Sequence, residues 1–164
     1  KHFFSYVILL NSSQISHEKQ KILQKPKKRN ETNVEEIFRN ISFDNILLKV
    51  DIEGSEYEII DQIINSSHKI LSLIIEFHKI DKYEDIFEDK IKLLQSKFEI
   101  IHIHGNNNTG TQRINLPKTL EITFVNKENY KDHNKEFRYD FPVKGIDFPN
   151  NLNFEDIQFS FKKN

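Results

Sequence analysis

The chain lacks several residue types, and each absence excludes a class of protein. Its 164 residues contain no cysteine, which excludes a disulfide framework and thiolate metal sites. The lack of cysteine also fits a cytoplasmic protein, the location that we expect. No apolar run reaches the length of about 18 residues that a membrane span needs, so we predict no membrane association. The apolar residues 1–10 have no small-residue cleavage site after them, so they predict a strand better than a signal peptide.

Glycine and methionine are scarce or absent. Glycine occurs only at positions 54, 105, 110 and 145, so the sequence has no glycine-rich loop for a phosphate or nucleotide. Methionine is missing altogether, including at position 1, and we interpret the chain as a fragment of something longer. The net charge of -1 gives no overall attraction to nucleic acid or acidic membranes, so we expect neither as a partner. The basic residues 25–29 are interpreted as a solvated loop.

The order of apolar and amphipathic segments predicts an α/β domain. Strands are expected at residues 3–10, 46–52, 70–77, 98–104 and 120–125, and helices at residues 14–24, at residues 34–41, after Ser55 and after Asp81. Alternation of strands and helices indicates a mostly parallel sheet with right-handed crossovers, and the last strand, which no helix precedes, is expected to be antiparallel. Continuous apolar runs at 46–52 and 70–77 predict neighbouring strands that are buried on both faces. We interpret residues 1–164 as one partial domain whose residues 127–164 form an irregular tail.

The most informative segment is residues 47–60, where a strand leads through an acidic turn into a helix. Asp51, Glu53 and Gly54 follow the strand directly. In α/β folds, ligands bind at the carboxyl ends of strands. Ser55 and Glu58 have the spacing of a capping box for the helix. Two carboxylates and a glycine at this position are hard to explain by packing alone.

Polar side chains also end the other predicted strands. Each could serve only as a helix cap, a loop residue or a strand residue, but together they would form one polar edge of the sheet. We expect Asp51, Glu76 and His104 to line a single cleft there. The complete set of candidates at this edge is Asp51, Glu53, Glu76, His78, His102, His104, Asn106, Asn107 and Glu121.

Two kinds of chemistry suit such an edge. A histidine or carboxylate could act as a general base that takes a proton from a hydroxyl nucleophile. Alternatively, carboxylate and imidazole groups could bind a hard metal ion. Because no His-Glu-x-x-His helix or other zinc spacing occurs, we assign no metal ligands.

Residues 49–60 resemble the Lys-x-Asp-x-Glu-Gly-x-Glu segment of FkbM-type methyltransferases. Residues 74–78, with the sequence Ile-Ile-Glu-Phe-His, match the strand that follows in those proteins. Residues 102–107, 116–124 and 141–151 are similar to later parts of one branch of the family. The resemblance covers roughly residues 33–151.

The resemblance implies a Rossmann-like methyltransferase fold and S-adenosylmethionine as the cofactor. It also implies methyl transfer to a hydroxyl of a sugar or secondary metabolite, so a small-molecule or glycan acceptor is expected. In the family, a glycine-rich cofactor loop lies upstream of the acidic segment. Residues 1–45 contain no glycine, so the fold looks truncated at its N-terminus and this chain alone is expected to bind the cofactor poorly.

Roles for the candidate residues follow from the resemblance. Asp51 and Glu53 are expected near the cofactor. The catalytic candidates, for proton removal and acceptor hydrogen bonds, are Asp51, Glu76, His78 and His104. Candidates for further contacts with the acceptor are Asn106, Asn107 and Glu121. Two alternatives stay open, a non-catalytic protein of this fold that binds a glycan or a partner, and a metal-dependent hydrolase. The sequence does not give the oligomeric state.

Overall fold

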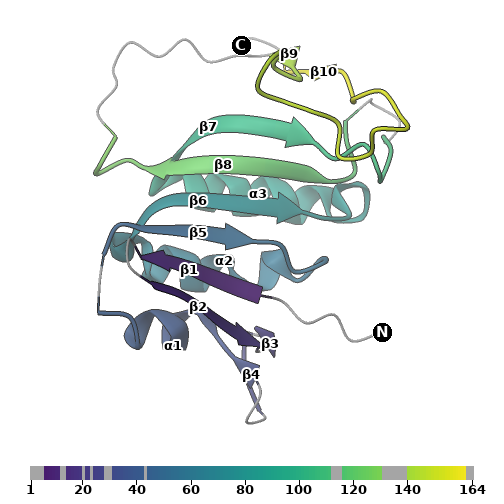
Figure 1. Cartoon of the computed structure of the whole chain (residues 1–164). Coiled ribbons are helices and arrows are strands. Elements are labelled where there is room, and N and C mark those ends of the chain that lie inside the picture. Colours follow the sequence, from purple (N-terminus) through teal and green to yellow (C-terminus); the bar gives the residue numbers. More distant parts are fainter. Residues whose placement is uncertain are drawn as a thin grey trace.

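A mixed four-stranded sheet forms the centre of the molecule (Figure 1). The computed structural model describes residues 6–11, 14–19, 21–22, 24–27, 31–42, 44–111, 116–130 and 140–161. The sheet consists of β5 (Ile46–Val50), β6 (Ile70–Phe77), β7 (Phe98–Gly105) and β8 (Leu120–Asn126), in the spatial order β5-β6-β8-β7. β5 is parallel to β6, whereas β8 is antiparallel to both of its neighbours, β6 and β7. The four strand predictions and the antiparallel direction of the last strand are confirmed.

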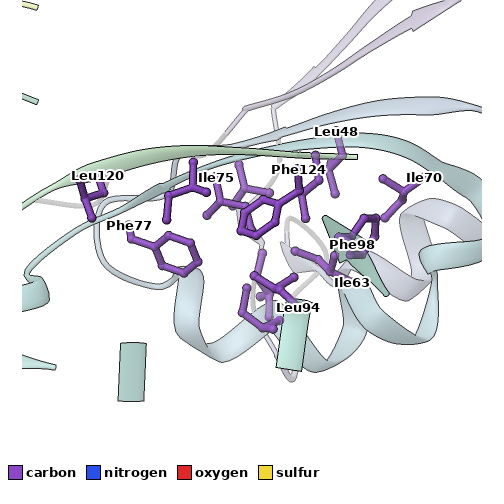
Figure 2. Packing of buried hydrophobic residues seen from close by; sticks show 14 of the residues in the cluster. Leu48, Ile63, Ile70, Ile75, Phe77, Leu94, Phe98, Leu120 and Phe124 are labelled. Atoms are coloured by element: carbon purple, nitrogen blue, oxygen red, sulfur yellow. The ribbon is translucent and has the colours of Figure 1, made fainter. Parts of the chain in front are cut away.

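Two helices, α2 (Glu56–Asn65) and α3 (Glu84–Gln95), lie on the same face of this sheet (Figure 1). α2 connects β5 to β6 and α3 connects β6 to β7, and both connections advance across the sheet in the same direction. Right-handed crossovers that advance in one direction place their helices on one face. The core fills the space between this face and the helices. Figure 2 shows Leu48, Ile75 and Phe124 of the sheet above Ile63 and Leu94 of the helices.

The prediction that β5 and β6 are neighbours is confirmed, but the prediction that they are buried on both faces is wrong. Residues of β5 alternate between buried and exposed, and Leu47 is 44% exposed. On β6, Ser72, Ile74 and Glu76 are only partly buried. A continuous apolar run does not reveal that both crossover helices cover the same face. The opposite face of the sheet, called the open face below, is therefore available to polar side chains.

The N-terminal part contains strands where a helix was predicted. β1 (Tyr6–Asn11) pairs in antiparallel fashion with β2 (Gln14–Lys19), and β3 (Lys21–Ile22) pairs in parallel with β4 (Glu31–Thr32). The helix predicted at 14–24 is therefore wrong, because backbone pairing between strands overrides a weak periodicity. The first three residues of the strand predicted at 3–10 lie outside the described residues. The next predicted helix is confirmed as α1 (Val34–Arg39).

The C-terminal segment 140–161 lies beside β7 (Figure 1). Its strands β9 (Asp140–Phe141) and β10 (Phe159–Ser160) form a short antiparallel pair, and the rings of Phe141 and Phe159 stack. Two 3-10 turns, η1 (Ser67–Lys69) and η2 (Ile80–Lys82), complete the elements. Among the described residues, none of the helices has the length and apolar character needed to cross a membrane.

Candidate active site

The acidic turn after β5 is held in shape by a residue that follows it, Glu56. Glu53 and Gly54 have positive φ angles of 60° and 107°, so the chain reverses sharply there. Glu56 Oε1 accepts hydrogen bonds from the backbone N–H groups of Ile52, at 3.1 Å, and Gly54, at 3.0 Å. The predicted capping box is wrong, because the Ser55 side chain makes no capping hydrogen bond. Instead, the Glu56 carboxylate, at the N-terminal and electrostatically positive end of α2, accepts hydrogen bonds from the N–H groups of the turn.

The same carboxylate oxygen holds His78, which follows β6 directly. His78 Nδ1 lies 2.9 Å from Glu56 Oε1. The Tyr57 hydroxyl donates a 2.7 Å hydrogen bond to the backbone carbonyl of His78, so both the ring and the backbone of this residue are fixed. Glu56 is fully buried, and its Oε2 has no hydrogen-bond partner within the part of the chain that the structure describes. An ionised carboxylate can only accept hydrogen bonds, so His78 donates from Nδ1.

Three carboxylates converge on the other nitrogen of His78. Its Nε2 lies 3.9 Å from an oxygen of each of Asp51, Glu53 and Glu76. The side chains of His78 and Glu76 are 13% and 12% exposed, whereas those of Asp51 and Glu53 are 43% and 52% exposed. The cluster formed by Asp51, Glu53, Glu76 and His78, called the rim cluster below, therefore opens to solvent on the side of the acidic turn.

Burial and neighbouring charges raise the pKa values of two residues of the rim cluster, His78 and Glu76, and lower the pKa of Glu56 behind it. Burial favours a lower pKa for His78, but the hydrogen bond to Glu56 and the surrounding carboxylates outweigh it and raise the pKa. Burial favours a higher pKa for Glu56, yet the hydrogen bonds from His78 and from the turn hold the pKa of this carboxyl below its usual range. Burial raises the pKa of Glu76, with a smaller opposing effect from the hydrogen bond to Asn106. A histidine and a carboxylate with raised pKa values therefore stand side by side.

Further predicted residues continue the polar edge across β8 and β7. Asn106 Nδ2 donates a 2.7 Å hydrogen bond to Glu76 Oε1. Glu121 pairs in register with Glu76 on one side and with His104 on the other. Glu121 also forms an ion pair with Lys49 of β5. Lys49 Nζ lies 2.7 Å from Glu121 Oε2, so this pair connects β5 to β8 over the open face. The polar residues thus follow the edge of the sheet from β5 to β7, and a single cleft lined by Asp51, Glu76 and His104 stays a prediction.

His104 lies on this edge but two strands away from Glu76, and it contacts the C-terminal segment. Its Nε2 lies 3.1 Å from Asp156 Oδ2. Its neighbour on the same strand face, His102, has Nε2 at 2.6 Å from Asp147 Oδ1. The structure therefore brings Asp51, Glu76 and His78 together, whereas His102 and His104 hold the segment 140–161 against the sheet.

Asn107 also holds this segment. Its Nδ2 donates to the carbonyls of Asn151, Phe154 and Glu155, and its Oδ1 accepts from the N–H of Asn151. These contacts give the buried Asn107 side chain a structural role. A contact with the acceptor stays a prediction for Asn107, as it does for Asn106 and Glu121.

The rim cluster offers two chemical possibilities. Ligand atoms of Asp51, Glu76 and His78 lie within 4.8 Å of one another, a spacing that could hold one metal ion. Alternatively, a histidine fixed from behind by a buried carboxylate can remove a proton from a hydroxyl.

Sequence reasoning missed three residues that shape this site: Lys49, Glu56 and Tyr57. Lys49 and Glu56 are the first and last residues of the Lys-x-Asp-x-Glu-Gly-x-Glu segment, so the resemblance could have pointed to them. For Tyr57, the sequence gives no indication that its hydroxyl reaches the backbone of a residue 21 positions later.

Residues 3–100 match the family described as Methyltransferase FkbM domain, which spans more than half of the chain and contains the complete rim cluster. No curated protein and no solved structure matches the chain.

Proposed function

Because the chain belongs to the FkbM methyltransferase domain family, we propose that it supplies the acceptor side of an S-adenosylmethionine-dependent O-methyltransferase. The proposed acceptor is a hydroxyl of a sugar or secondary metabolite. Family membership supports methyl transfer and S-adenosylmethionine as the methyl source. The rim cluster supports the choice of a hydroxyl as the acceptor.

The observation that carries this proposal is the arrangement of His78 behind three carboxylates. A hydroxyl is a weak nucleophile, so the enzyme must orient it and remove its proton. His78 Nε2 faces Asp51, Glu53 and Glu76 at 3.9 Å each. Carboxylates around the base can accept hydrogen bonds from other hydroxyls of a polyol, and Asn106 and Glu121 would extend these contacts. The cytoplasm is the proposed location of the reaction.

The residues present do not form the glycine-rich turn that an adenosyl cofactor needs. Such a turn lets backbone amides approach the ligand closely, and side chains obstruct that approach. A Cβ atom on Gly54 would lie 2.7 Å from Lys79 Nζ, and one on Gly105 would lie 2.6 Å from Pro117, so these two glycines make room for the protein itself. Gly110 and Gly145 have open space around them and stand alone in the sequence. The part of the chain that the structure describes therefore offers side chains for the acceptor but no such turn for the cofactor.

Two measurements test this proposal. Titration calorimetry of this chain with S-adenosylmethionine should give weak binding or none. The protein encoded by the complete open reading frame, incubated with methyl-labelled S-adenosylmethionine and a panel of sugars and polyols, should give a labelled methyl ether. Asp51→Ala and Glu76→Ala should each reduce its formation. Tight cofactor binding by this chain, or no labelled product from the complete protein with any hydroxyl acceptor, would contradict the proposal.

One observation favours a second function, that of a metal-dependent hydrolase. Asp51, Glu76 and His78 have the spacing of a metal site. Metal analysis of the purified protein separates the two functions. A stoichiometric divalent ion that is lost in Glu76→Ala, together with hydrolysis of an ester or glycoside, would favour the hydrolase.

A further inference from the structure

Glu56, the buried carboxylate behind the rim cluster, has so far been described only by the contacts that hold the turn and His78 in place. It is the first residue of α2, and its side chain is fully buried. A buried carboxylate is costly unless it is paired and hydrogen-bonded. One of its oxygens makes three contacts, with two N–H groups of the acidic turn and with His78 Nδ1. It thus connects the turn that carries Asp51 and Glu53 to the histidine that these carboxylates face.

We propose that Glu56 is a positioning residue that keeps the Nδ1 proton of His78 in place, so that Nε2 is the base for the acceptor hydroxyl. This inference rests on the proposed function and deepens it. In this arrangement His78 is the base, and Glu56 is the third group that orients it through Nδ1. Since the Glu56 carboxylate accepts from Nδ1, the neutral ring has its lone pair on Nε2. That lone pair faces the open side of the rim cluster.

The proposed proton transfer runs from the acceptor hydroxyl to His78 Nε2. The O–H bond of the acceptor breaks, its electron pair stays on oxygen, and the proton goes to Nε2. The resulting imidazolium is stabilised by Glu56 at Nδ1 and by Asp51, Glu53 and Glu76 around Nε2. Two lysines lie near these carboxylates: Lys79 Nζ donates to the Glu53 carbonyl at 3.3 Å, and Lys49, which is paired with Glu121, also interacts with the charges of Asp51 and Glu76.

His78 suits this role better than the other candidates. Glu76 Oε1 already accepts a hydrogen bond from Asn106. His104 Nε2 is paired with Asp156. His78 has an orienting partner on one nitrogen, and its other nitrogen lies 3.9 Å from each carboxylate of the rim cluster, too far for a direct hydrogen bond.

Nuclear magnetic resonance of the chain with ¹⁵N-labelled histidine tests the inference without any methyl donor. Above its pKa, His78 should carry its proton on Nδ1, with Nε2 unprotonated. In Glu56→Gln the pKa of His78 should fall and the proton should redistribute between the two nitrogens. The exposed residue Glu58 lies on the same helix, and Glu58→Gln should change neither property. His78→Gln assigns the resonance, and the exposed His68 serves as an internal reference.

The outcomes separate a positioning role from a structural one. If Glu56→Gln only weakened the fold, the pKa and proton distribution of His78 would stay as they are in the unchanged chain, which would overturn the inference. A proton on Nε2 in the unchanged chain would overturn it as well, even if Glu56→Gln failed to fold. Failure of the complete protein to transfer methyl groups would contradict the proposed function and leave the nitrogen spectra unaffected.

In an active protein, kcat/KM should rise with pH through the pKa of His78, which lies above the ordinary histidine value of 6.5. Glu56→Gln should move this rise to lower pH, because the pKa of the base falls. An unchanged pH profile in Glu56→Gln would count against the inference.

Discussion

Neutralising Glu56 should destabilise the fold by an amount that depends on pH. The side chain makes three hydrogen bonds through Oε1, two to backbone N–H groups and one to His78. A hydrogen bond to a charged group contributes about 1.5–3 kcal/mol, against about 0.5–1.5 kcal/mol for a neutral pair. Glu56→Gln keeps an acceptor oxygen but loses the charge, so each bond weakens by about 1 kcal/mol. Because the uncharged side chain is also less costly to bury, the free energy of unfolding should fall by at most about 3 kcal/mol in total.

The pH dependence follows from the two pKa shifts. The pKa of Glu56 is lowered from 4.5, so its contribution is present above that pH and is lost as the pH falls through the folded pKa. The pKa of His78 is raised from 6.5, so its contribution is complete below that pH and is lost as the pH rises through the folded pKa. The difference between the unchanged chain and Glu56→Gln should therefore be largest between pH 4.5 and pH 6.5.

Urea unfolding followed by circular dichroism measures this difference, since the chain has no tryptophan for fluorescence. Glu58→Gln, on the exposed side of the same helix, should change the free energy of unfolding by less than about 0.5 kcal/mol. The reasoning is refuted if Glu56→Gln matches this control, or if its effect is the same at high pH as between the two pKa values.

Three further effects can be measured, two by urea unfolding and one by limited proteolysis. Tyr57→Phe removes the donor to the His78 carbonyl and should reduce the free energy of unfolding by about 1 kcal/mol; no change would mean that this bond does not form in solution. Asn107→Ala removes the side chain that holds residues 151–155, so limited proteolysis should cut within 140–161 faster than in the unchanged chain; equal cleavage rates would contradict that role. Lys49→Ala should cost less than about 1 kcal/mol, because its ion pair with Glu121 is exposed, and a larger loss would show that the pair is more than a surface contact.

The sequence predicted the sheet well because long apolar runs are strong indicators of strands. The strand at 70–77 is found with the same bounds, and the antiparallel direction of β8 follows from the absence of a helix before it. The segment 14–24 failed because its few apolar positions did not determine its structure, and pairing with β1 did.

The candidate site was predicted in outline because each polar residue ends or begins a strand at one edge. Asp51, Glu76 and His78 do come together. Two features could not be read from the sequence. The partner of His78 is decided by the path of the turn, which brings Glu56 back under it. The separation of His104 from Glu76 arises because β8, the last strand of the four-stranded sheet in sequence order, inserts between β6 and β7.

The most direct test of the account is the rate of methyl transfer by the complete protein with His78→Gln. If His78 is the base for the acceptor hydroxyl, this change should reduce the rate by about 10²–10⁴-fold, the usual cost of losing a general base. His68→Gln, at an exposed position in η1, should keep the rate of the unchanged protein. Circular dichroism should verify that both variants are folded. Equal rates for His78→Gln and His68→Gln would contradict the placement of the acceptor site at the rim cluster.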